Sequence, residues 1–324
     1  MSYELIIGDC VNSMKSMPEQ SVNCCVTSPP YFGLRDYGVD GQIGLEETPE
    51  QYVAKMVEVF REVRRVLRDD GTLWLNIGDS YARQAGDDSK KDPKSINTGY
   101  SAVVAGGAAK KGNNRPPAGC KPKDLIGIPW MLAFALRADG WYLRQEIIWH
   151  KPNPMPESVK DRCTKAHEQI FLLSKSPRYY FDSEAMREES VSAGRIPGGN
   201  KNIDPSRRDA SRDMTVPVAE TRNRRSVWSV ATRPYKGAHF ATFPPALIEP
   251  CILAGCPEGG VVLDPFGGSG TTAGVAVAHS RNAIICELNP DYGLLSQERV
   301  ASIISRLSPA NDNRSNSGGR NNDK

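Results

Sequence analysis

Short apolar runs that alternate with helical segments constrain this chain more than any other feature of its sequence. Seven runs have the length and composition of strands, at residues 3–9, 21–26, 72–77, 141–149, 167–174, 261–264 and 282–287. Most are separated by a predicted helix, which favours an α/β doubly wound sheet. No helix separates 141–149 from 167–174, so these two strands should pair antiparallel. Ligands of such sheets bind at loops after the carboxyl ends of strands.

The segment after Thr48 is the clearest predicted helix. Thr48 suits the N-cap, Pro49 the first helical position, and Gln51 completes a capping box. Apolar residues then recur with the helical period as far as Leu67, and Gly71 should stop the helix. We expect this helix to cover one face of the sheet.

A glycine-rich turn follows the predicted strand 261–264, in the sequence VLDPFGGSGTT (262–272). Glycines let a backbone approach a ligand closely, and the amides at the start of the next helix favour an anionic group. Glu287 ends the next strand, where an acid can accept hydrogen bonds from ribose hydroxyls. The turn lacks the lysine of a phosphate-binding loop, and Thr272 breaks the dinucleotide pattern. An adenosine-containing cofactor other than ATP or NAD fits, although a glycine turn alone can be only a tight turn.

A second loop, VTSPPYFG (26–33), follows the predicted strand 21–26. Two consecutive prolines have fixed φ angles and no N–H, so the carbonyls of Ser28 and Pro29 should project as rigid acceptors. Tyr31 adds a flat ring. Acceptors beside a stacking ring suit an exocyclic amino group on a planar base, whereas an extended turn that ends a strand is the simpler reading of SPPY alone.

The two loops, with Asp9 and Glu287 at strand ends, resemble the β class of amino-group DNA methyltransferases that use S-adenosylmethionine. In that class, as here, the SPPY block precedes the glycine loop. The resemblance covers about residues 3–80, 140–181 and 227–300. It implies a Rossmann-like seven-stranded methyltransferase sheet, circularly permuted, with one antiparallel hairpin strand and a smaller target-recognition region.

The resemblance and the composition together predict four parts of the chain. Residues 1–181 would form the catalytic half of the methyltransferase domain, with a long mobile loop at 82–123. Residues 182–226 would be the target-recognition region, and residues 227–307 the cofactor-binding half. The polar composition of residues 308–324 is typical of a disordered tail.

The resemblance also implies roles for individual residues. Ser28, Pro29, Pro30 and Tyr31 would hold the target base and carry the catalysis. The cofactor would be bound by Asp9, Thr27, Phe243, Pro244, Asp264, Phe266, Gly267, Gly268, Ser269, Gly270, Thr271 and Glu287, with Glu287 on the ribose and Asp9 on the adenine amino group. Trp149, Lys151 and Asn153, in the block WHKPNPMP, would line the entrance to the base pocket.

The reaction expected from this resemblance is transfer of the sulfonium methyl directly to an amino nitrogen of a flipped base. Ser before the two prolines is associated with the 4-amino group of cytosine in this family, and Asp with the 6-amino group of adenine, so Ser28 favours cytosine and adenine stays the alternative. An RNA or protein-glutamine methyltransferase is less compatible with the order of the loops. A non-catalytic DNA-binding protein is a further alternative.

The cysteines and histidines predict neither a nucleophile nor a metal site. The chain has eight cysteines without a C-x-x-C pair, and several lie in apolar runs, so we expect free thiols that mostly fill the core. Methylation at carbon 5 of cytosine would need a Cys nucleophile in a Pro-Cys motif, and neither Cys24 nor Cys25, just before the SPPY loop, follows a proline. The histidines are dispersed, and no metal is expected.

Charge is distributed unevenly along the chain, although the formal net charge is only +3. Residues 82–123 hold nine Lys and Arg against three Asp, and residues 194–236 hold ten against four Asp and Glu. Each segment carries +6, so the other residues sum to −9. Two basic segments on an acidic scaffold suggest double-stranded DNA as the partner.

Partners and location are predicted more coarsely. No long apolar run or signal-like amino terminus is present, so the expectation is a cytoplasmic protein without a membrane partner. A cognate restriction endonuclease is a candidate partner, and both a monomer and a homodimer remain open.

Overall fold

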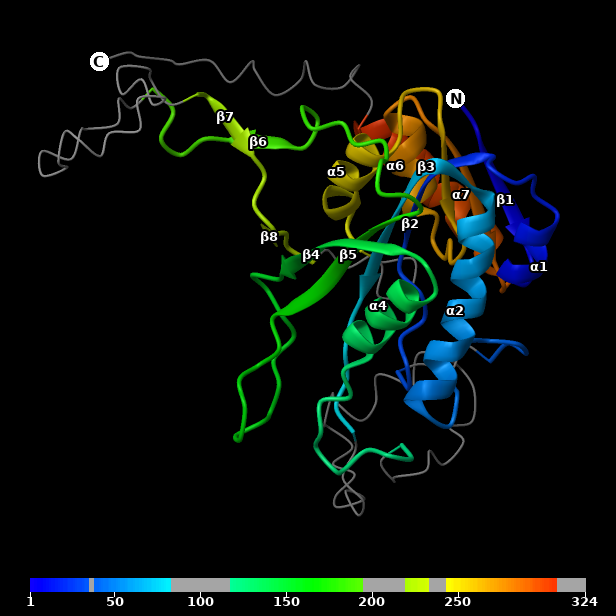
Figure 1. Ribbon diagram of the computed structural model, residues 1–324, viewed down its shortest axis with the longest axis vertical. Coiled ribbons are helices and arrows are strands. Elements are labelled where there is room, and N and C mark those ends of the chain that lie inside the picture. The colour runs from blue at the N-terminus through cyan, green and yellow to red at the C-terminus, as the bar shows by residue number, and fades with distance from the viewer. Residues whose placement is uncertain (35–37, 83–116, 195–218, 233–242, 308–324) are drawn as a thin grey trace, which may run out of the picture.

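The computed structural model describes residues 1–34, 38–82, 117–194, 219–232 and 243–307 (Figure 1). The elements follow in the order β1 (Tyr3–Ile7), α1 (Cys10–Lys15), β2 (Val22–Thr27), α2 (Pro49–Val66), β3 (Leu67–Ile77), α4 (Ile128–Ala138), β4 (Tyr142–His150), β5 (His167–Ser174), β6 (Arg187–Glu189), β7 (Thr221–Asn223), β8 (Val227–Ser229), α5 (Pro245–Gly255), β9 (Val261–Asp264), α6 (Thr271–Ala278), β10 (Asn282–Glu287) and α7 (Tyr292–Leu307). All seven predicted strands are present, and β6, β7 and β8 are additional.

One large sheet organises the described part of the chain, with strand order β1-β10-β9-β2-β3-β5-β4-β8, while β6 and β7 pair separately. Neighbouring strands are parallel except where β5 meets β3 and β4. The predicted α/β sheet with one antiparallel hairpin strand is therefore confirmed. The predicted count of seven strands is one short, because β8 adds an eighth; its three residues are too few to show a strand pattern.

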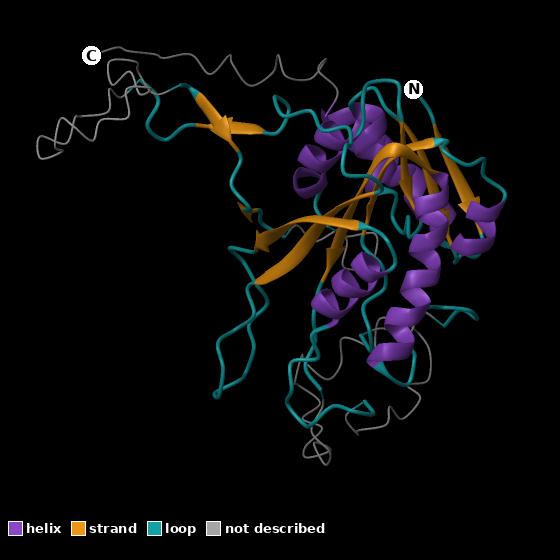
Figure 2. Cartoon of the chain, in the orientation of Figure 1, coloured by secondary structure: helices purple, strands orange, loops and turns teal. Residues whose placement is uncertain are grey.

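Helices cover both faces of this sheet (Figure 2). Side chains of α1, α2 and α4 pack against one face, where Cys25 and Leu73 lie, and those of α5, α6 and α7 against the other, where Cys24 and Trp74 lie. Adjacent strand residues thus enter opposite cores, as the pleat requires. All eight cysteines are free and six are buried, so the predicted role as core filler is confirmed for most of them.

Helix α2 begins where predicted but ends earlier. The Thr48 side chain accepts from the Gln51 amide, and the Gln51 side chain accepts from the Thr48 amide, which is the predicted capping box. The prediction that the helix continues to Gly71 is wrong, because Leu67 is extended and opens β3 opposite Val22. The Leu67 carbonyl accepts from the Lys175 ammonium (2.8 Å) instead of continuing the helix.

Several predictions fall wholly or partly outside the described residues. They concern most of the mobile loop at 82–123, the central part of the target-recognition region at 182–226, and the tail at 308–324. Within residues 182–226, the described ends contribute β6 and β7, in which Glu188 lies opposite Arg222. Among the described helices, none is both long and apolar enough to cross a membrane.

The capping box of α2 gives a test of the fold. We expect Thr48→Ala to lower the free energy of unfolding by about 1 kcal/mol, because the Gln51 amide at the helix start loses its acceptor. Denaturant unfolding followed by circular dichroism measures this. Glu58→Ala, which removes only the exposed Lys55–Glu58 pair of the same helix, should change stability by less than about 0.5 kcal/mol. Equal losses in the two variants would contradict the role of the cap.

Candidate active site

The two loops singled out in the sequence meet at the carboxyl ends of β2 and β9. These strands are parallel neighbours, with Cys24 opposite Val262 and Cys25 opposite Leu263. From β9 the chain proceeds to β10 on one side, and from β2 it proceeds to β3 on the other. The sheet order therefore reverses between β9 and β2, and such a switch point forms the ligand crevice of open α/β sheets.

The buried side chain of Asp264 connects the two loops through hydrogen bonds. Its Oδ1 accepts from the Thr27 hydroxyl (2.6 Å) and the Phe266 amide (3.0 Å), and its Oδ2 accepts from the Thr272 hydroxyl (2.7 Å). The residue is only 2% exposed. Burial raises the pKa of the carboxyl group to about 6, although the three donors partly offset this rise. Thr27 and Asp264 thus lie beneath the crevice and position its two loops.

The glycine turn adopts a shape that larger residues could not share. A Cβ atom on Gly267 would lie 2.8 Å from the Ile285 Cβ, and one on Gly270 would lie 2.7 Å from the Val300 Cγ2. Gly268 and Gly270 have positive φ angles of 49° and 77°. The turn is therefore pressed onto β10 and α7. A Cβ on Gly268 would meet only the Phe266 carbonyl, at 3.9 Å, so this part of the turn is open.

The acidic residues at the ends of β1 and β10 are close to the turn. Glu287 accepts from the Gly268 amide and from the Asn289 amide, both at 2.8 Å, and burial raises the pKa of its carboxyl group. The Gly8 amide donates to the Glu287 carbonyl (2.8 Å), which joins the end of β1 to that of β10. Asp9 follows directly, and its Oδ1 caps α1 by accepting from the Asn12 amide.

The remaining predicted cofactor residues fall into two groups, one in the turn and the other outside it. Ser269 and Thr271 are buried at the start of α6, with their hydroxyls 3.4 Å apart. Phe266 is half-buried. Pro244 is buried and precedes α5, while the half-buried Phe243 packs against the core of the α5–α7 face. In the described part of the chain, no hydrogen bond or ring contact joins these last two residues to the turn.

Tyr31 is held between a glycine and a cluster of polar groups. A Cβ on Gly78 would lie 2.6 Å from Cε2 of the Tyr31 ring, so only glycine allows the ring to lie against the end of β3. The Tyr31 hydroxyl donates to Glu168 Oε2 (2.7 Å). It also lies 3.5 Å from Ser28 Oγ and 3.5 Å from Asn76 Oδ1. Burial, and then the charge of Glu168, raise the pKa of the Tyr31 hydroxyl well above its usual value.

The backbone carbonyls of the SPPY loop differ in their hydrogen bonding. The Pro30 carbonyl accepts from the Tyr52 hydroxyl (2.8 Å), which anchors the loop to α2. Among the hydrogen bonds of the described residues, none uses the carbonyls of Ser28 or Pro29. Ser28 is half-buried and Pro29 is buried. The Ser28 hydroxyl donates to the Tyr31 oxygen, so Ser28 keeps the lone pairs of its hydroxyl and its carbonyl available for a ligand.

The WHKPNPMP block contributes to the site differently from what the sequence predicts. Trp149 is only 3% exposed, and its indole donates to the Val230 carbonyl (2.7 Å), so it does not line an entrance. Asn153 pairs with the backbone of Thr232 through two hydrogen bonds. Lys151 does reach the Tyr31 cluster, because its ammonium forms an ion pair with Glu168 and lies 4.3 Å from the centre of the Trp149 ring.

Sequence reasoning missed Asn76, Gly78 and Glu168. Asn76 and Gly78 lie at the end of β3 and Glu168 at the start of β5, so none of them belongs to a recognisable motif loop. One sequence signal pointed to Glu168: it is an acidic residue at the start of a strand whose central residues, IFLL, are all apolar. An acid at such a position needs a partner, but its partners are 17 to 137 residues away in sequence.

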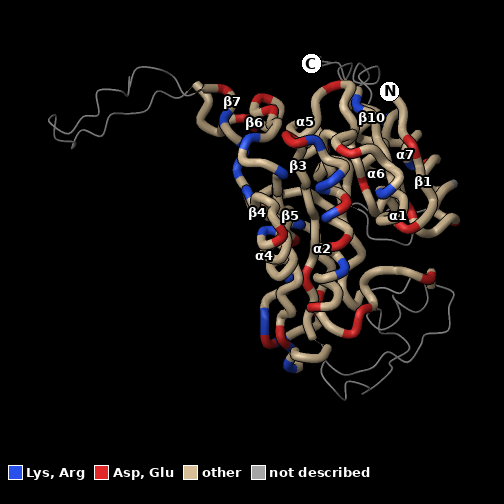
Figure 3. The backbone as a smooth tube through the Cα atoms, turned by 45° about the vertical axis from the view of Figure 1, so that its right-hand side comes forward, with Lys and Arg blue, Asp and Glu red and all other residues tan. Residues whose placement is uncertain are grey.

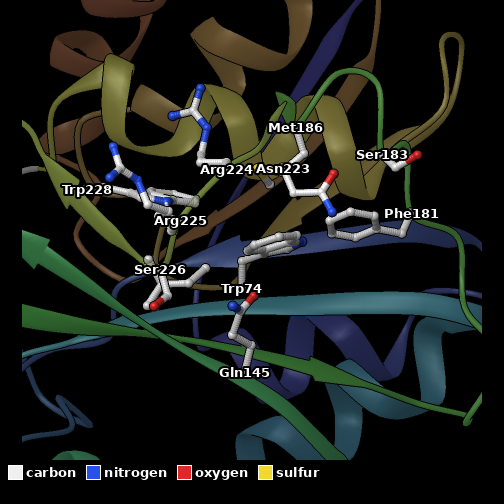
Figure 4. A pocket seen from close by; sticks show the side chains of 11 residues that line it. Trp74, Gln145, Phe181, Ser183, Met186, Asn223, Arg224, Arg225, Ser226 and Trp228 are labelled. Atoms are coloured by element: carbon white, nitrogen blue, oxygen red, sulfur yellow. Dashed lines mark hydrogen bonds between the residues drawn. The ribbon is translucent and has the colours of Figure 1, made fainter. Parts of the chain in front are cut away.

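A separate cavity of about 220 Å³ lies on the face of the sheet that α5, α6 and α7 cover; its lining side chains are drawn in Figure 4. Trp74 and Phe181 line it, with ring centroids 6.3 Å apart, together with Arg224 and Arg225. Trp74 belongs to the core of the α5–α7 face, whereas Tyr31 packs against the other core. The cavity is therefore distinct from the strand-end crevice. In the described part of the chain, no cluster of His, Cys, Asp and Glu could hold a metal ion.

Comparisons with known proteins agree with this geometry. Residues 22–298 match the family N6_N4_Mtase, described as DNA methylase. The Type II methyltransferase M.Cfr9I of Citrobacter freundii is 50% identical over 91% of this chain and 87% of that protein. The Type II methyltransferase M.SmaI of Serratia marcescens is 46% identical over 92% and 91%.

Two solved structures resemble this fold. One is a DNA modification methylase of Thermus thermophilus complexed with S-adenosyl-L-methionine, with a TM-score of 0.56, 25% identity and coverage of 94% of this chain and 96% of that chain. The other is the PvuII DNA methyltransferase (cytosine-N4-specific), with a TM-score of 0.61, 19% identity and coverage of 95% and 93%.

The raised pKa of Asp264 predicts a pH-dependent difference between the wild type and Asp264→Asn. The folded carboxyl group keeps its proton up to about pH 6, whereas the unfolded one loses it near its usual value of 3.8. Wild-type stability should therefore fall relative to the variant as pH rises from about 4 to 6, by about 3 kcal/mol in total. The asparagine oxygen can still accept from Thr27 and Phe266. Denaturant unfolding of both proteins between pH 4 and 7 measures this, and a constant difference would contradict the prediction.

Proposed function

Because this chain belongs to the DNA methylase family of N4-cytosine and N6-adenine methyltransferases, we propose that its target is the 4-amino group of cytosine. The family assignment confirms the predicted resemblance, and with it a Type II DNA amino-methyltransferase that uses S-adenosylmethionine. The choice of cytosine rests on one observation. Ser28 stands before the two prolines, where Ser is associated with cytosine and Asp with adenine in this family.

The residues around the crevice fit S-adenosylmethionine. The open side of Gly268 allows a ligand to approach the backbone, while Gly267 and Gly270 keep the turn against the core. We assign the methionine part to Asp264, Phe266, Gly267, Gly268, Ser269, Gly270 and Thr271, with Thr27 supporting the loop and Phe243 and Pro244 flanking it. Glu287 and Asp9 stand at neighbouring strand ends, and their carboxylates retain acceptor capacity for ribose hydroxyls and an adenine amino group.

Asp264 and Thr271 act in this assignment through the shape of the turn. Both side chains are buried and already hydrogen-bonded, Asp264 to Thr27 and Thr272, and Thr271 to Arg299. Their contribution is to fix the backbone amides between β9 and α6. Amides at the start of a helix favour a carboxylate such as that of the methionine part.

The chain's own groups can prepare an amino nitrogen for methylation. When bound, S-adenosylmethionine supplies a methyl group on a positively charged sulfur. The Ser28 hydroxyl and carbonyl accept the two amino hydrogens of the base, which draws the nitrogen lone pair out of the ring system. The Tyr31 ring stacks on the base and offsets part of the few kcal/mol that flipping costs. The prolines hold these groups in place without any rearrangement.

Neither the cysteines before the SPPY loop nor the Pro250-Cys251 dipeptide supports covalent catalysis, since Cys251 is buried within α5. Cys24 and Cys25 precede the SPPY loop, but both are fully buried. Burial raises the pKa of both thiols well above the usual value, which disfavours the thiolate that a nucleophile needs. The proposed reaction is therefore a direct transfer to the amino nitrogen. Adenine N6 methylation, which uses the same geometry, is the second candidate.

Mass spectrometry of enzymatically digested DNA identifies the product base. DNA incubated with the protein and S-adenosylmethionine should yield N4-methylcytosine, and N6-methyladenine in its place would overturn the choice of cytosine.

Ser28→Ala and Tyr31→Ala should abolish methylation while calorimetry shows unchanged cofactor binding. Ser21→Ala, directly before β2, and Tyr142→Ala, at the start of β4, are the matched controls and should keep the activity.

Double-stranded DNA is the proposed macromolecular partner, and the Type II names of the relatives support a cognate restriction endonuclease. The chain between β7 and β8 contains Arg224 and Arg225, and blue segments of Lys or Arg are visible on the tube between the labels β7 and β4 (Figure 3). Arg222 and Arg225 pair with Glu188, whereas Arg224 has no ion pair among the described residues. Arg224 packs over the Trp228 ring with its Nε buried, and we propose that its uncommitted guanidinium contacts a phosphate.

Salt dependence of DNA binding tests the role of Arg224. We expect Arg224→Ala to reduce the slope of log affinity against log salt concentration by about one, because one phosphate contact is lost. Fluorescence anisotropy with labelled DNA at several salt concentrations measures the slope. Lys55→Ala removes a cation that already pairs with Glu58 on α2 and should leave the slope unchanged. The same slope for Arg224→Ala and the wild type would remove Arg224 from the interface.

A further inference from the structure

Glu168 stands at the start of β5 beside the SPPY loop and accepts hydrogen bonds from three donors. Its Oε2 accepts from the Tyr31 hydroxyl (2.7 Å) and the Asn76 amide (3.3 Å), and its Oε1 is ion-paired with the Lys151 ammonium. The Glu168 side chain is only 15% exposed. Lys151 is held in turn over the Trp149 ring. This cluster comes from β3, β4, β5 and the SPPY loop.

The charge of Glu168 fixes the direction of the hydrogen bond from Tyr31. A carboxylate has no proton to donate, so the hydroxyl must donate to it. Asn76 Oδ1 is a competing acceptor at 3.5 Å, but the 2.7 Å contact to the charged oxygen is the shorter and stronger one. Asn76 is itself oriented, because its amide nitrogen donates to the Gln169 carbonyl (3.1 Å). The hydroxyl proton of Tyr31 therefore points to Glu168.

The direction of the hydrogen bond from Tyr31 to Glu168 also sets the direction of the hydrogen bond between Ser28 and Tyr31. With its proton on the Glu168 side, the Tyr31 oxygen presents lone pairs to the Ser28 hydroxyl, 3.5 Å away at the long end of hydrogen-bonding distance. Ser28 then donates toward Tyr31, and the lone pairs of Ser28 Oγ remain for another partner. An amino group has hydrogens to donate, so it needs an acceptor at this position.

We propose that Glu168 is a positioning residue, which acts through Tyr31 to present the Ser28 hydroxyl as a hydrogen-bond acceptor to the target amino group. This inference rests on the proposed function, since it concerns the same amino group. Glu168 does not touch the base itself. It also holds one end of Tyr31 while Gly78 lies against the ring, so that the stacking surface and the direction of the hydrogen bonds are set together.

Glu168→Gln is the variant that separates charge from size. The Gln side-chain amide keeps one acceptor oxygen, and its nitrogen has two N–H groups to donate. These N–H groups would face a position already surrounded by the donors of Tyr31, Asn76 and Lys151. An amide N–H that faces Tyr31 can donate to it, and the Tyr31 hydroxyl can then donate to Ser28. Ser28 would turn its own proton toward the amino group, which is unfavourable for the reaction.

Single-turnover and steady-state methylation of DNA test the proposal. We expect Glu168→Gln to lower kcat by about 10- to 100-fold, because an oriented acceptor at the reacting nitrogen is lost. The KM for DNA and the Kd for S-adenosylmethionine should stay within about twofold of the wild type. Tyr31→Phe keeps the ring and removes the hydroxyl, so it should lower kcat to a similar extent. The double variant should be no slower than Tyr31→Phe alone.

The control is Glu249→Gln, which alters a half-buried carboxylate bonded to His279 (2.7 Å) between α5 and α6. It should keep the wild-type kcat. A kcat of Glu168→Gln within twofold of the wild type would overturn the proposal, as would a full additional loss in the Tyr31→Phe background. If Glu168→Gln does not fold, an unchanged kcat of Tyr31→Phe would overturn it equally. Wild-type protein that methylates no DNA would refute the proposed function itself, and the role of Glu168 with it.

Discussion

The hydrogen bond from Thr27 to Asp264 joins two halves of the active site that are 237 residues apart in sequence. One loop follows β2 and the other follows β9, and the adjacency of these strands would by itself leave the two loops free to separate. Asp264 accepts from both loops and from the first helix turn after the glycines. Because the carboxyl group is buried, each of these donors would be costly to leave unpaired. The crevice between the loops therefore has fixed walls.

Local patterns made much of this structure predictable from sequence. The strands, the capping box of Thr48 and the turn at Gly267 to Gly270 each depend on residues within a few positions of one another. The end of α2 at Val66 was not predictable, because Leu67 is drawn into β3 by Val22 and by Lys175, both distant in sequence. The helical spacing of apolar residues continues to Leu67, so the sequence pattern does not show that the helix ends at Val66.

The polar cluster around Tyr31 escaped prediction for the same reason. Glu168, Asn76 and Lys151 are ordinary strand or loop residues until the sheet brings them together. The reversed direction of β5 is decisive here. In a wholly parallel sheet, the start of a strand lies at the edge opposite the ligand crevice. Because β5 is antiparallel to β3, its first residues reach the same edge as the last residues of its neighbours.

The position of β10 between β1 and β9 has a consequence for folding of the protein. Within the described residues, β1 pairs only with β10, Tyr3 opposite Ala283 and Ile7 opposite Glu287. β1 therefore cannot enter the sheet until β10, far later in the sequence, is available to pair with it. Until then β1 has no neighbour, and β2 has a neighbour on one side only. Long-range pairing of this kind slows folding, and the unpaired edges of β1 and β2 are exposed to other chains until β10 and β9 pair with them.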